Sequence, residues 1–405
     1  MRKVIPSPAG GQVSVFTSDP LTEAIRREVG AVIEQIVAEE MLTKLDAGPY
    51  ARTKQRQGYR NGSEARTLVT SLGPVTIQKP RARVWNGEAE EEFRSDLLPR
   101  YRRRARALDD AILSMYLGGV NTRKLKKIVQ ALYPGGTLSA SAVSRIVARL
   151  RDHFETWRTR SLAAEELLYV YLDAIMIKVR SAGRVVSRAI LVAVGVRKTG
   201  EKVLYGLYSK GSESHEACKG VLDDLVKRGL RAPKLAIIDG GKGLRSALEE
   251  VWSRTDVQRC AVHKLRNLLA HAPKHAHEEV REDFRAIVYA ETRDEAQRAH
   301  DRFMAKWSKR CESVATSLAE AGSELLTFFA YPKAQWKSLR TTNVIERLNG
   351  EFRRRVKTQA SYPNEEAVLV LLFGLLATGQ VRLHKISGWE EIPEVVDQKK
   401  KGEAA

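Results

Sequence analysis

The chain has 405 residues and carries 69 Lys and Arg against 49 Asp and Glu, which gives a formal net charge of +20. Its hydrophobic fraction of 43% excludes collagen-like and disordered proteins and predicts a globular protein of two or three domains, because single cores stop growing near about 250–300 residues. The excess of positive charge predicts a polyanionic partner.

The compartment is predicted from what the sequence lacks. The amino terminus carries no apolar secretory segment, and only three cysteines occur, so we expect a reducing cytoplasm and no disulfide framework. The longest apolar run spans residues 367–377 and is shorter than the roughly 20 residues of a membrane helix. We therefore expect a core helix there and no membrane partner.

The first predicted element is an amphipathic helix over residues 20–46, which Gly48 and Pro49 end. We assign it to an N-terminal segment, residues 1–50, as a possible dimer element. A basic linker follows, and two alternating runs around Gly73-Pro74 predict a β-hairpin. We expect residues 51–105 to bind DNA, with candidate contacts from Arg52, Lys54, Arg56, Tyr59 and Arg60.

Three helical patterns separated by glycine-rich turns predict a helix-turn-helix-like DNA-binding domain over residues 106–160, in which Ser139 or Ser141 caps the third helix. Residues 51–150 carry a net charge of +12, the densest in the chain. The alternative is a three-helix packing module with solvated charges. The candidate DNA contacts are Arg123, Lys124, Lys126, Lys127, Ser141 and Arg145.

The periodicity changes after residue 165. Three strand patterns form a predicted antiparallel meander, and alternating helices and strands continue it into a mixed α/β sheet. The predicted strands cover residues 167–180, 184–197, 202–210, 234–240 and 257–263. Residues 264–336 have long polar helical stretches and predict an all-helical insertion. We assign residues 165–263 and 337–385 to the catalytic core and residues 386–405 to a tail.

Three carboxylates are the candidates for chemistry. Asp173 lies within an apolar strand, Asp239 ends another, and a buried carboxylate is tolerated only when it is paired or binds a metal. Glu346 lies on a helix, where a capping box with Asn343 is the structural alternative. Two aspartates and a glutamate can bind two hard cations, Mg²⁺ or Mn²⁺, for phosphoryl transfer.

Two competing motifs are rejected. Residues 240–243 follow a strand with Gly-Gly-Lys-Gly but lack the spacing of a phosphate-binding loop, so we expect no nucleotide cofactor. Cys260 and His263 have the spacing of metal ligands, but no second pair stands at a zinc-finger distance. We expect these two residues to support the active site rather than to bind zinc.

Several segments resemble the bacterial transposases of the Mutator type. These are LDAIMIKV, LAIIDGGKGL, CAVHKLRN and RTTNVIERLNGEFRRRVK, together with GYRNG and GPVTIQKPR upstream. The resemblance implies a ribonuclease-H-like core with Asp173, Asp239 and Glu346 as its two-aspartate, one-glutamate (DDE) triad, and a helical insertion that contacts the transposon end. It also implies a C-x-x-H element at Cys260 and His263, and we assign Asn343 and Arg347 to active-site support.

The function expected from these features is a transposase that cleaves transposon-end DNA and joins the freed 3′-hydroxyl to target DNA. The expected partners are double-stranded DNA, as terminal inverted repeats and target, and a second copy of the chain, with action at the bacterial nucleoid. Alternatives are a structure-specific nuclease on the same core and a non-enzymatic helix-turn-helix regulator. Arg353 is a further candidate DNA contact. Trp307 and Trp336 are candidates because exposed rings can stack on unpaired bases, and the alternative is that both rings pack the helical insertion onto the core.

Overall fold

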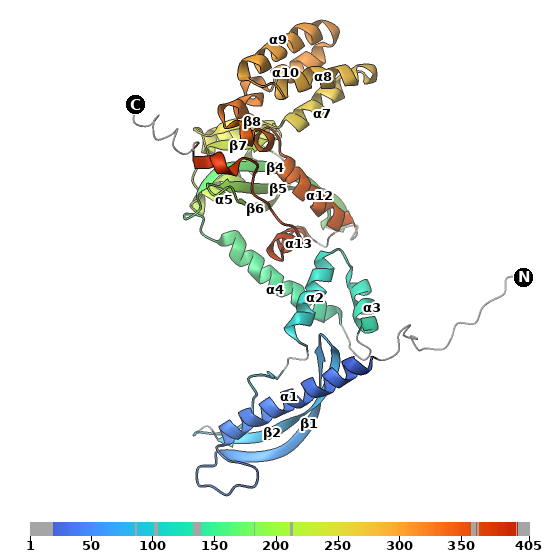
Figure 1. Ribbon diagram of the computed structural model, residues 1–405, viewed down its shortest axis with the longest axis vertical. Coiled ribbons are helices and arrows are strands. Elements are labelled where there is room, and N and C mark those ends of the chain that lie inside the picture. The colour runs from blue at the N-terminus through green and yellow to red at the C-terminus, as the bar shows by residue number, and fades with distance from the viewer. Residues whose placement is uncertain are drawn as a thin grey trace, which may run out of the picture. The chain divides into compact units, whose positions relative to one another are not determined.

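The computed structural model in Figure 1 describes residues 19–85, 87–100, 104–132, 139–181, 183–210, 214–357, 362, 364–393 and 395. The chain divides into two units, Met1–Ala148 and Arg149–Ala405. Most of the predicted tail and the loop before Ser139 lie outside the described residues. Among the described residues, every helix is too short or too polar to cross a membrane.

The first unit begins with the predicted helix, α1 (Pro20–Leu45), whose first turn is capped by Asp19. Its buried side chains Val37, Met41 and Leu45 share one hydrophobic cluster with Val75 and Ile77 of the hairpin. The helix therefore packs directly on the sheet that follows it.

The predicted hairpin is confirmed and is longer than its apolar pattern suggested. It consists of β1 (Gly58–Thr70) and β2 (Gly73–Trp85), which pair antiparallel, and β3 (Glu90–Glu92) adds a third strand beside β2. Part of the predicted basic linker belongs to β1. A run of three glutamates has no apolar alternation, so β3 was not predicted.

Three helices follow where the sequence predicted them: α2 (Arg106–Leu117), α3 (Thr122–Leu132) and α4 (Ala140–Thr159), of which only the first part of α4 belongs to this unit. Leu108, Ile112, Leu125 and Val143 pack in their common core. The Ser139 hydroxyl accepts a hydrogen bond from the Ala142 amide at 3.1 Å, so Ser139 is the capping serine. The boundary between the two units falls within α4.

The second unit is built on a mixed five-stranded sheet with the order β6-β5-β4-β7-β8. Strands β4, β5 and β6 form the predicted antiparallel meander, and β7 and β8 run parallel to β4. Their bounds are β4 (Leu167–Ser181), β5 (Arg184–Arg197), β6 (Lys202–Lys210), β7 (Leu235–Ile238) and β8 (Asp256–Arg259). The mixed α/β fold class is confirmed.

Helices cover this sheet on both faces, as Figure 1 shows. On one face, α5 (His215–Lys227) and α6 (Lys242–Val251) share a hydrophobic cluster with Val170 and Leu172 of β4. Helix α12 (Asn343–Lys357) contacts β4, and α13 (Glu365–Ala377), the predicted apolar core helix, contacts β6. Successive side chains of a strand point to opposite faces, so Asp173 points away from the α5 and α6 side.

A helical region with its own hydrophobic core lies between β8 and α12 in the sequence. It contains α7 (Ala261–His271), α8 (His277–Val288), α9 (Arg293–Arg310) and α10 (Glu312–Ala319). Short helical turns at Gly322–Leu325, Thr327–Ala330, Lys333–Gln335 and α11 (Trp336–Leu339) lead back to the sheet, and others occur at Lys274–Ala276 and Trp389–Glu391. The predicted helical character of this region is confirmed.

The strand predicted over residues 257–263 is wrong at its carboxyl end. Strand β8 ends at Arg259, Cys260 precedes α7, and His263 lies within that helix. A short apolar run such as Cys260-Ala261-Val262 suits either a strand or a helix start, and Leu268 at helical spacing from Ala261 decides for the helix.

Candidate active site

Two neighbouring parallel strands bring Asp173 and Asp239 to the same level of the sheet. Leu172 of β4 pairs with Ile238 of β7, and each aspartate is the next residue along its chain. Adjacent strands lie about 4.8 Å apart, so the two carboxylates start from neighbouring backbone positions. Asp239 Oδ1 also accepts a hydrogen bond from the Gly241 amide at 2.9 Å, which fixes the turn into α6.

Asp173 is the most buried of the three candidate carboxylates, with 6% of its surface exposed. Asn349 of α12 donates a hydrogen bond from Nδ2 to Asp173 Oδ2 at 3.0 Å. Burial raises the pKa of Asp173 to about 6; His263 opposes this shift, and the negative charges of Asp239 and Glu346 add to it. Asp173 therefore lies within the electrostatic reach of both other candidates.

Glu346 lies in the first turn of α12 and is half-buried. Its Oε1 is 3.0 Å from Arg266 Nη1 and 3.5 Å from His263 Nε2, and this oxygen has no hydrogen-bond partner among the described residues. The capping-box alternative is not formed, since Asn343 is the first helical residue and its amide instead lies 3.4 Å from the Thr341 hydroxyl. Helix capping therefore does not explain this glutamate.

Cys260 and His263 join the start of the helical region to the start of α12. Cys260 Sγ accepts hydrogen bonds from the Thr342 amide and hydroxyl, both at 3.2 Å, and the Thr342 hydroxyl lies 3.4 Å from His263 Nδ1. Burial alone would raise the pKa of the Cys260 thiol, but hydrogen bonds with His263 and Thr342 outweigh burial and lower it. The same contact with Cys260 raises the pKa of His263.

This contact sets the position of Glu346. The Thr342 carbonyl accepts a hydrogen bond from the Glu346 amide at 2.9 Å, so the residue held by Cys260 also begins the helix that carries the glutamate. Within the described ranges, no three His, Cys, Asp or Glu side chains lie close enough together to form a metal site.

Asn349 is the site residue that the sequence analysis did not select. Three residues beyond Glu346, it is almost fully buried, and its Oδ1 has no hydrogen-bond partner in the described structure. The only signal in the sequence is its helical spacing from Glu346, which puts both residues on neighbouring parts of one helix face.

In the first unit, predicted DNA contacts line a cavity of about 800 Å³. Lys54, Arg56 and Tyr59 meet Arg83 and Trp85 there, and both aromatic rings are at least half exposed. Arg83 and Trp85 were not selected, although alternation along β2 could have placed them on one face. The exposed Arg52 and half-buried Arg60 lie outside the lining of this cavity.

The predicted cations of α3 and α4 face solvent. Leu125 and Val129 bury one side of α3, which leaves the four cations exposed: Arg123, Lys124, Lys126 and Lys127. On α4, Ser141 and Arg145 are exposed in the same way, as are Asn343, Arg347 and Arg353 on α12.

Of the two predicted base-stacking tryptophans, Trp307 is enclosed in the protein and Trp336 is partly covered. Trp307 is 1% exposed in the core of the helical region, and its Nε1 donates to Asp283 Oδ2 at 2.9 Å. Trp336 is half-buried, donates to the Tyr331 carbonyl at 2.7 Å and packs edge-on against Phe329. The expectation for Trp307 is wrong, because an enclosed ring has no face for a base, and Trp336 is used mainly for packing.

Comparisons with known proteins identify the family of this chain. The profile of the family described as "Transposase, Mutator family" matches residues 12–382. The transposase for insertion sequence element ISRM5 of Rhizobium meliloti is 36% identical over 89% of this chain and 88% of its own length. The transposase for IS406 of Burkholderia multivorans is 34% identical over 90% of this chain and 94% of its own length. The transposase for IS256 in transposon Tn4001 of Staphylococcus aureus is 32% identical over 85% of this chain and 87% of its own length.

The chain therefore belongs to the Mutator family of transposases. Transposases cut DNA and transfer its strands, so the protein is a DNA-binding enzyme of insertion-sequence transposition.

Proposed function

We propose that Asp173, Asp239 and Glu346 are the catalytic DDE triad of this transposase. The observation that carries the proposal is the placement of Asp173 and Asp239, each directly after the paired residues Leu172 and Ile238 of neighbouring strands. Burial and the charges of Asp239 and Glu346 also raise the pKa of Asp173 to about 6. Perturbed carboxylates that converge from separate elements are typical of functional sites. Glu346 contributes from a helix that Asn349 ties to Asp173.

The donor types, carboxylate and amide oxygens, suit hard divalent cations, although the three carboxylates are not gathered into one cluster in the described structure. Mg²⁺ and Mn²⁺ prefer carboxylate and amide oxygens, and the buried Asn349 Oδ1 and Glu346 Oε1 both lack hydrogen bonds in the described structure. Asp173 and Asp239 would hold a cation between them, with Glu346 on the side of α12. Bound Mg²⁺ or Mn²⁺ would activate the attacking hydroxyl or water and stabilise the leaving oxygen.

The protein's own groups supply the positioning. Asn349 orients the Asp173 carboxylate, Thr342 fixes the first turn of α12 against Cys260, and Arg266 and His263 compensate the charge of Glu346. We assign His263 and Arg266 to holding Glu346 ready at the edge of the site. Such support restricts the rotamers of residues that must be accurately placed.

We propose that the second unit is a ribonuclease-H-like core interrupted by the helical region. The support is its strand order, in which an antiparallel meander is extended by two parallel strands, with one aspartate on the central strand and one after its parallel neighbour.

We also propose that α2, α3 and α4 form a helix-turn-helix-like DNA-binding module, which the exposed cations of α3 support.

The test of function is a cleavage and joining assay on labelled DNA that carries the ends of the element encoding this chain. In Mg²⁺ or Mn²⁺ we expect nicked ends and a joined product with target DNA; with EDTA we expect neither. Cleavage without joining would identify a nuclease. Binding without any metal-dependent cleavage would contradict the DDE proposal.

We propose that the first unit recognises the terminal inverted repeats as double-stranded DNA, with action at the bacterial nucleoid, where both end and target DNA lie.

Arg145 is the candidate base reader because it is exposed near the start of α4. Arg145→Ala should cost about 1–3 kcal/mol on terminal DNA and little on random DNA, as measured by fluorescence anisotropy.

The matched control is Lys124→Ala on α3. A residue that neutralises a phosphate should weaken both DNAs alike and make the slope of log K against log salt shallower by about 0.9. Equal losses on both DNAs for Arg145→Ala would assign that residue to the backbone instead.

We propose that the protein acts as a homodimer joined through α1. The face of α1 turned away from β2 exposes a stripe of apolar side chains: Leu21 by 67%, Val32 by 53%, Ile36 by 39% and Ile25 by 38%. Two copies of one helix can bury such a stripe against each other, which a single copy leaves in water.

The double variant Leu21→Glu/Val32→Glu should convert dimers to monomers in sedimentation velocity at micromolar concentration, because four charges would meet in the interface. Ala31→Glu, exposed on another side of α1, is the control and should remain dimeric. A double variant that sediments as the wild type does would contradict this interface.

A further inference from the structure

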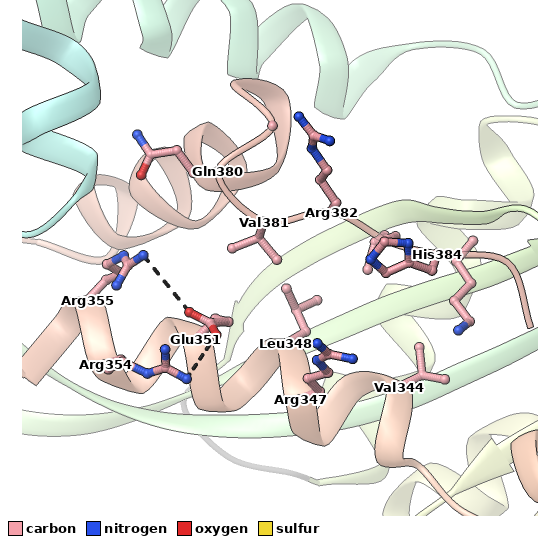
Figure 2. Close-up of a pocket in the computed structure, with 13 residues that line it drawn as sticks. Val344, Arg347, Leu348, Glu351, Arg354, Arg355, Gln380, Val381, Arg382 and His384 are labelled. Atoms are coloured by element: carbon pink, nitrogen blue, oxygen red, sulfur yellow. Dashed lines mark ion pairs between the residues drawn. The ribbon is translucent and has the colours of Figure 1, made fainter. Parts of the chain in front are cut away.

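A cationic pocket lies beside α12, on a different side of the helix from Asn349 and Asp173. It has a volume of about 470 Å³ and lies between α12 and the segment that follows α13. Figure 2 shows Arg347 and Arg354 on α12 and Arg382 and His384 on that segment, with the Arg382 side chain extending away from the helix. Lys202, the first residue of β6, completes the lining.

Most of the positive charge in this pocket is not neutralised. Glu351, the one carboxylate among the residues that line it, forms ion pairs with Arg354 at 2.9 Å and with Arg355 at 4.0 Å. Lys202, Arg347 and Arg382 form no ion pair with any carboxylate in the described part of the chain. Burial, and then the nearby charge of Arg347, lower the pKa of Lys202.

Such an arrangement costs stability unless an anion is bound. Lys202 is half-buried, whereas Arg347 and Arg382 are exposed. Like charges held close together repel each other, and phosphates accept charge-assisted hydrogen bonds from several arginines at once. The cations are spread along a helix and an extended segment rather than gathered at one point. That spread suits a chain of phosphates better than one small anion.

The distances along α12 match a nucleic-acid backbone. Glu346 and Arg354 are eight residues apart, which corresponds to about 12 Å along a helix. Phosphates of one DNA strand advance by about 3.4 Å per nucleotide along the duplex axis, so this length spans about three to four of them. Arg347, the residue after Glu346, and Arg354 are both exposed on α12, so a strand that crosses the exposed side of the helix from Glu346 can reach the pocket.

We propose that this pocket binds the phosphodiester backbone of the DNA strand that reacts at the triad, a few nucleotides from the reacting phosphate. Lys202, Arg347 and Arg382 contact successive phosphates, and Glu351 holds Arg354 and Arg355 in place along the wall. The proposal rests on the proposed function, because it takes Glu346 as the place where the strand reacts.

The test is the salt dependence of DNA binding by the full-length protein without divalent cations. In Lys202→Gln/Arg382→Gln, two lost phosphate contacts should make the slope of log K against log salt shallower by about 1.8. The ratio of variant to wild-type Kd should then shrink about tenfold between 50 and 200 mM salt. The control Arg254→Gln removes an exposed cation just before β8, at the opposite edge of the sheet from β6, and should leave the slope unchanged.

A second measurement locates the contact on the DNA. Neutral methylphosphonate linkages, placed one at a time along the strand, should weaken wild-type binding at two or three positions near the cleavage site. In Arg382→Gln, the neutral linkage at the phosphate that Arg382 contacts should weaken binding much less than it does in the wild type, because the variant already lacks that contact. Arg382 is exposed, so this variant should fold normally even if the half-buried Lys202 does not tolerate glutamine.

The outcomes separate this inference from the proposed function. A wild-type enzyme that cleaves end DNA, together with variants of unchanged slope, overturns the pocket and leaves the triad intact. Parallel slope changes in Arg254→Gln would show a general effect of charge and also overturn it. If the wild-type protein never cleaves end DNA but the double variant shows the expected shallower slope, the DDE proposal is contradicted and the pocket remains a DNA contact.

Discussion

Asp239→Asn and Glu346→Gln should each reduce end cleavage and strand transfer by at least about a thousandfold, equivalent to about 4 kcal/mol of transition-state stabilisation. Each change removes one negative charge from a cation site while keeping the size of the side chain. End binding should stay near the wild-type level, since neither residue is one of the proposed DNA contacts in either unit. The rates are measured on labelled end DNA in Mg²⁺.

The matched control is Glu249→Gln on α6, an exposed carboxylate ion-paired with Arg245. It loses the same charge and should cleave and join as the wild type does. If Asp239→Asn or Glu346→Gln retained wild-type cleavage, that residue would be removed from the triad.

Trp307→Ala should destabilise the second unit by about 3–5 kcal/mol, because it removes a fully buried ring from the core of the helical region. For a unit of this size the melting temperature should fall by about 6–20 °C. Strand transfer per folded molecule, measured well below the transition, should be unchanged, since the ring offers no face to DNA.

Trp307→Phe separates packing from hydrogen bonding. It keeps an aromatic ring and loses the bond to Asp283, which Lys306 still contacts at 2.6 Å, so the loss should be only about 1–2 kcal/mol. Trp307→Ala with wild-type stability and lost strand transfer would return this residue to the DNA surface.

The sequence predicted elements whose signal is local. The strands β4, β5 and β6 are long apolar runs with clear turns, and Asp173 was notable because it interrupts one of them. The start of α7 was missed because three apolar residues do not distinguish a strand from a helix. The strand β3 was missed because its pairing with β2 overrides the low strand propensity of glutamate.

The contacts of the candidate site are not local and could not be predicted in this way. Asn349 and Asp173 are 176 residues apart, and only the packing of α12 on β4 shows that they meet. Burial of Trp307 is likewise a property of four helices packed together, whereas its sequence neighbours are mostly polar. The carboxylates could be chosen from the sequence because of their residue type and position. The residues that contact them could be identified only from the folded structure.

The helical region leaves and re-enters the sheet unit at one place. The Ala261 amide donates to the Arg340 carbonyl at 2.9 Å, and Cys260 holds Thr342, so about eighty residues begin and end at adjoining backbone positions. A loop whose ends already meet adds little closure entropy when its length changes, because that cost grows only logarithmically. Evolution can therefore lengthen, shorten or exchange this region while the carboxylate of Glu346 keeps its distance from the two aspartates.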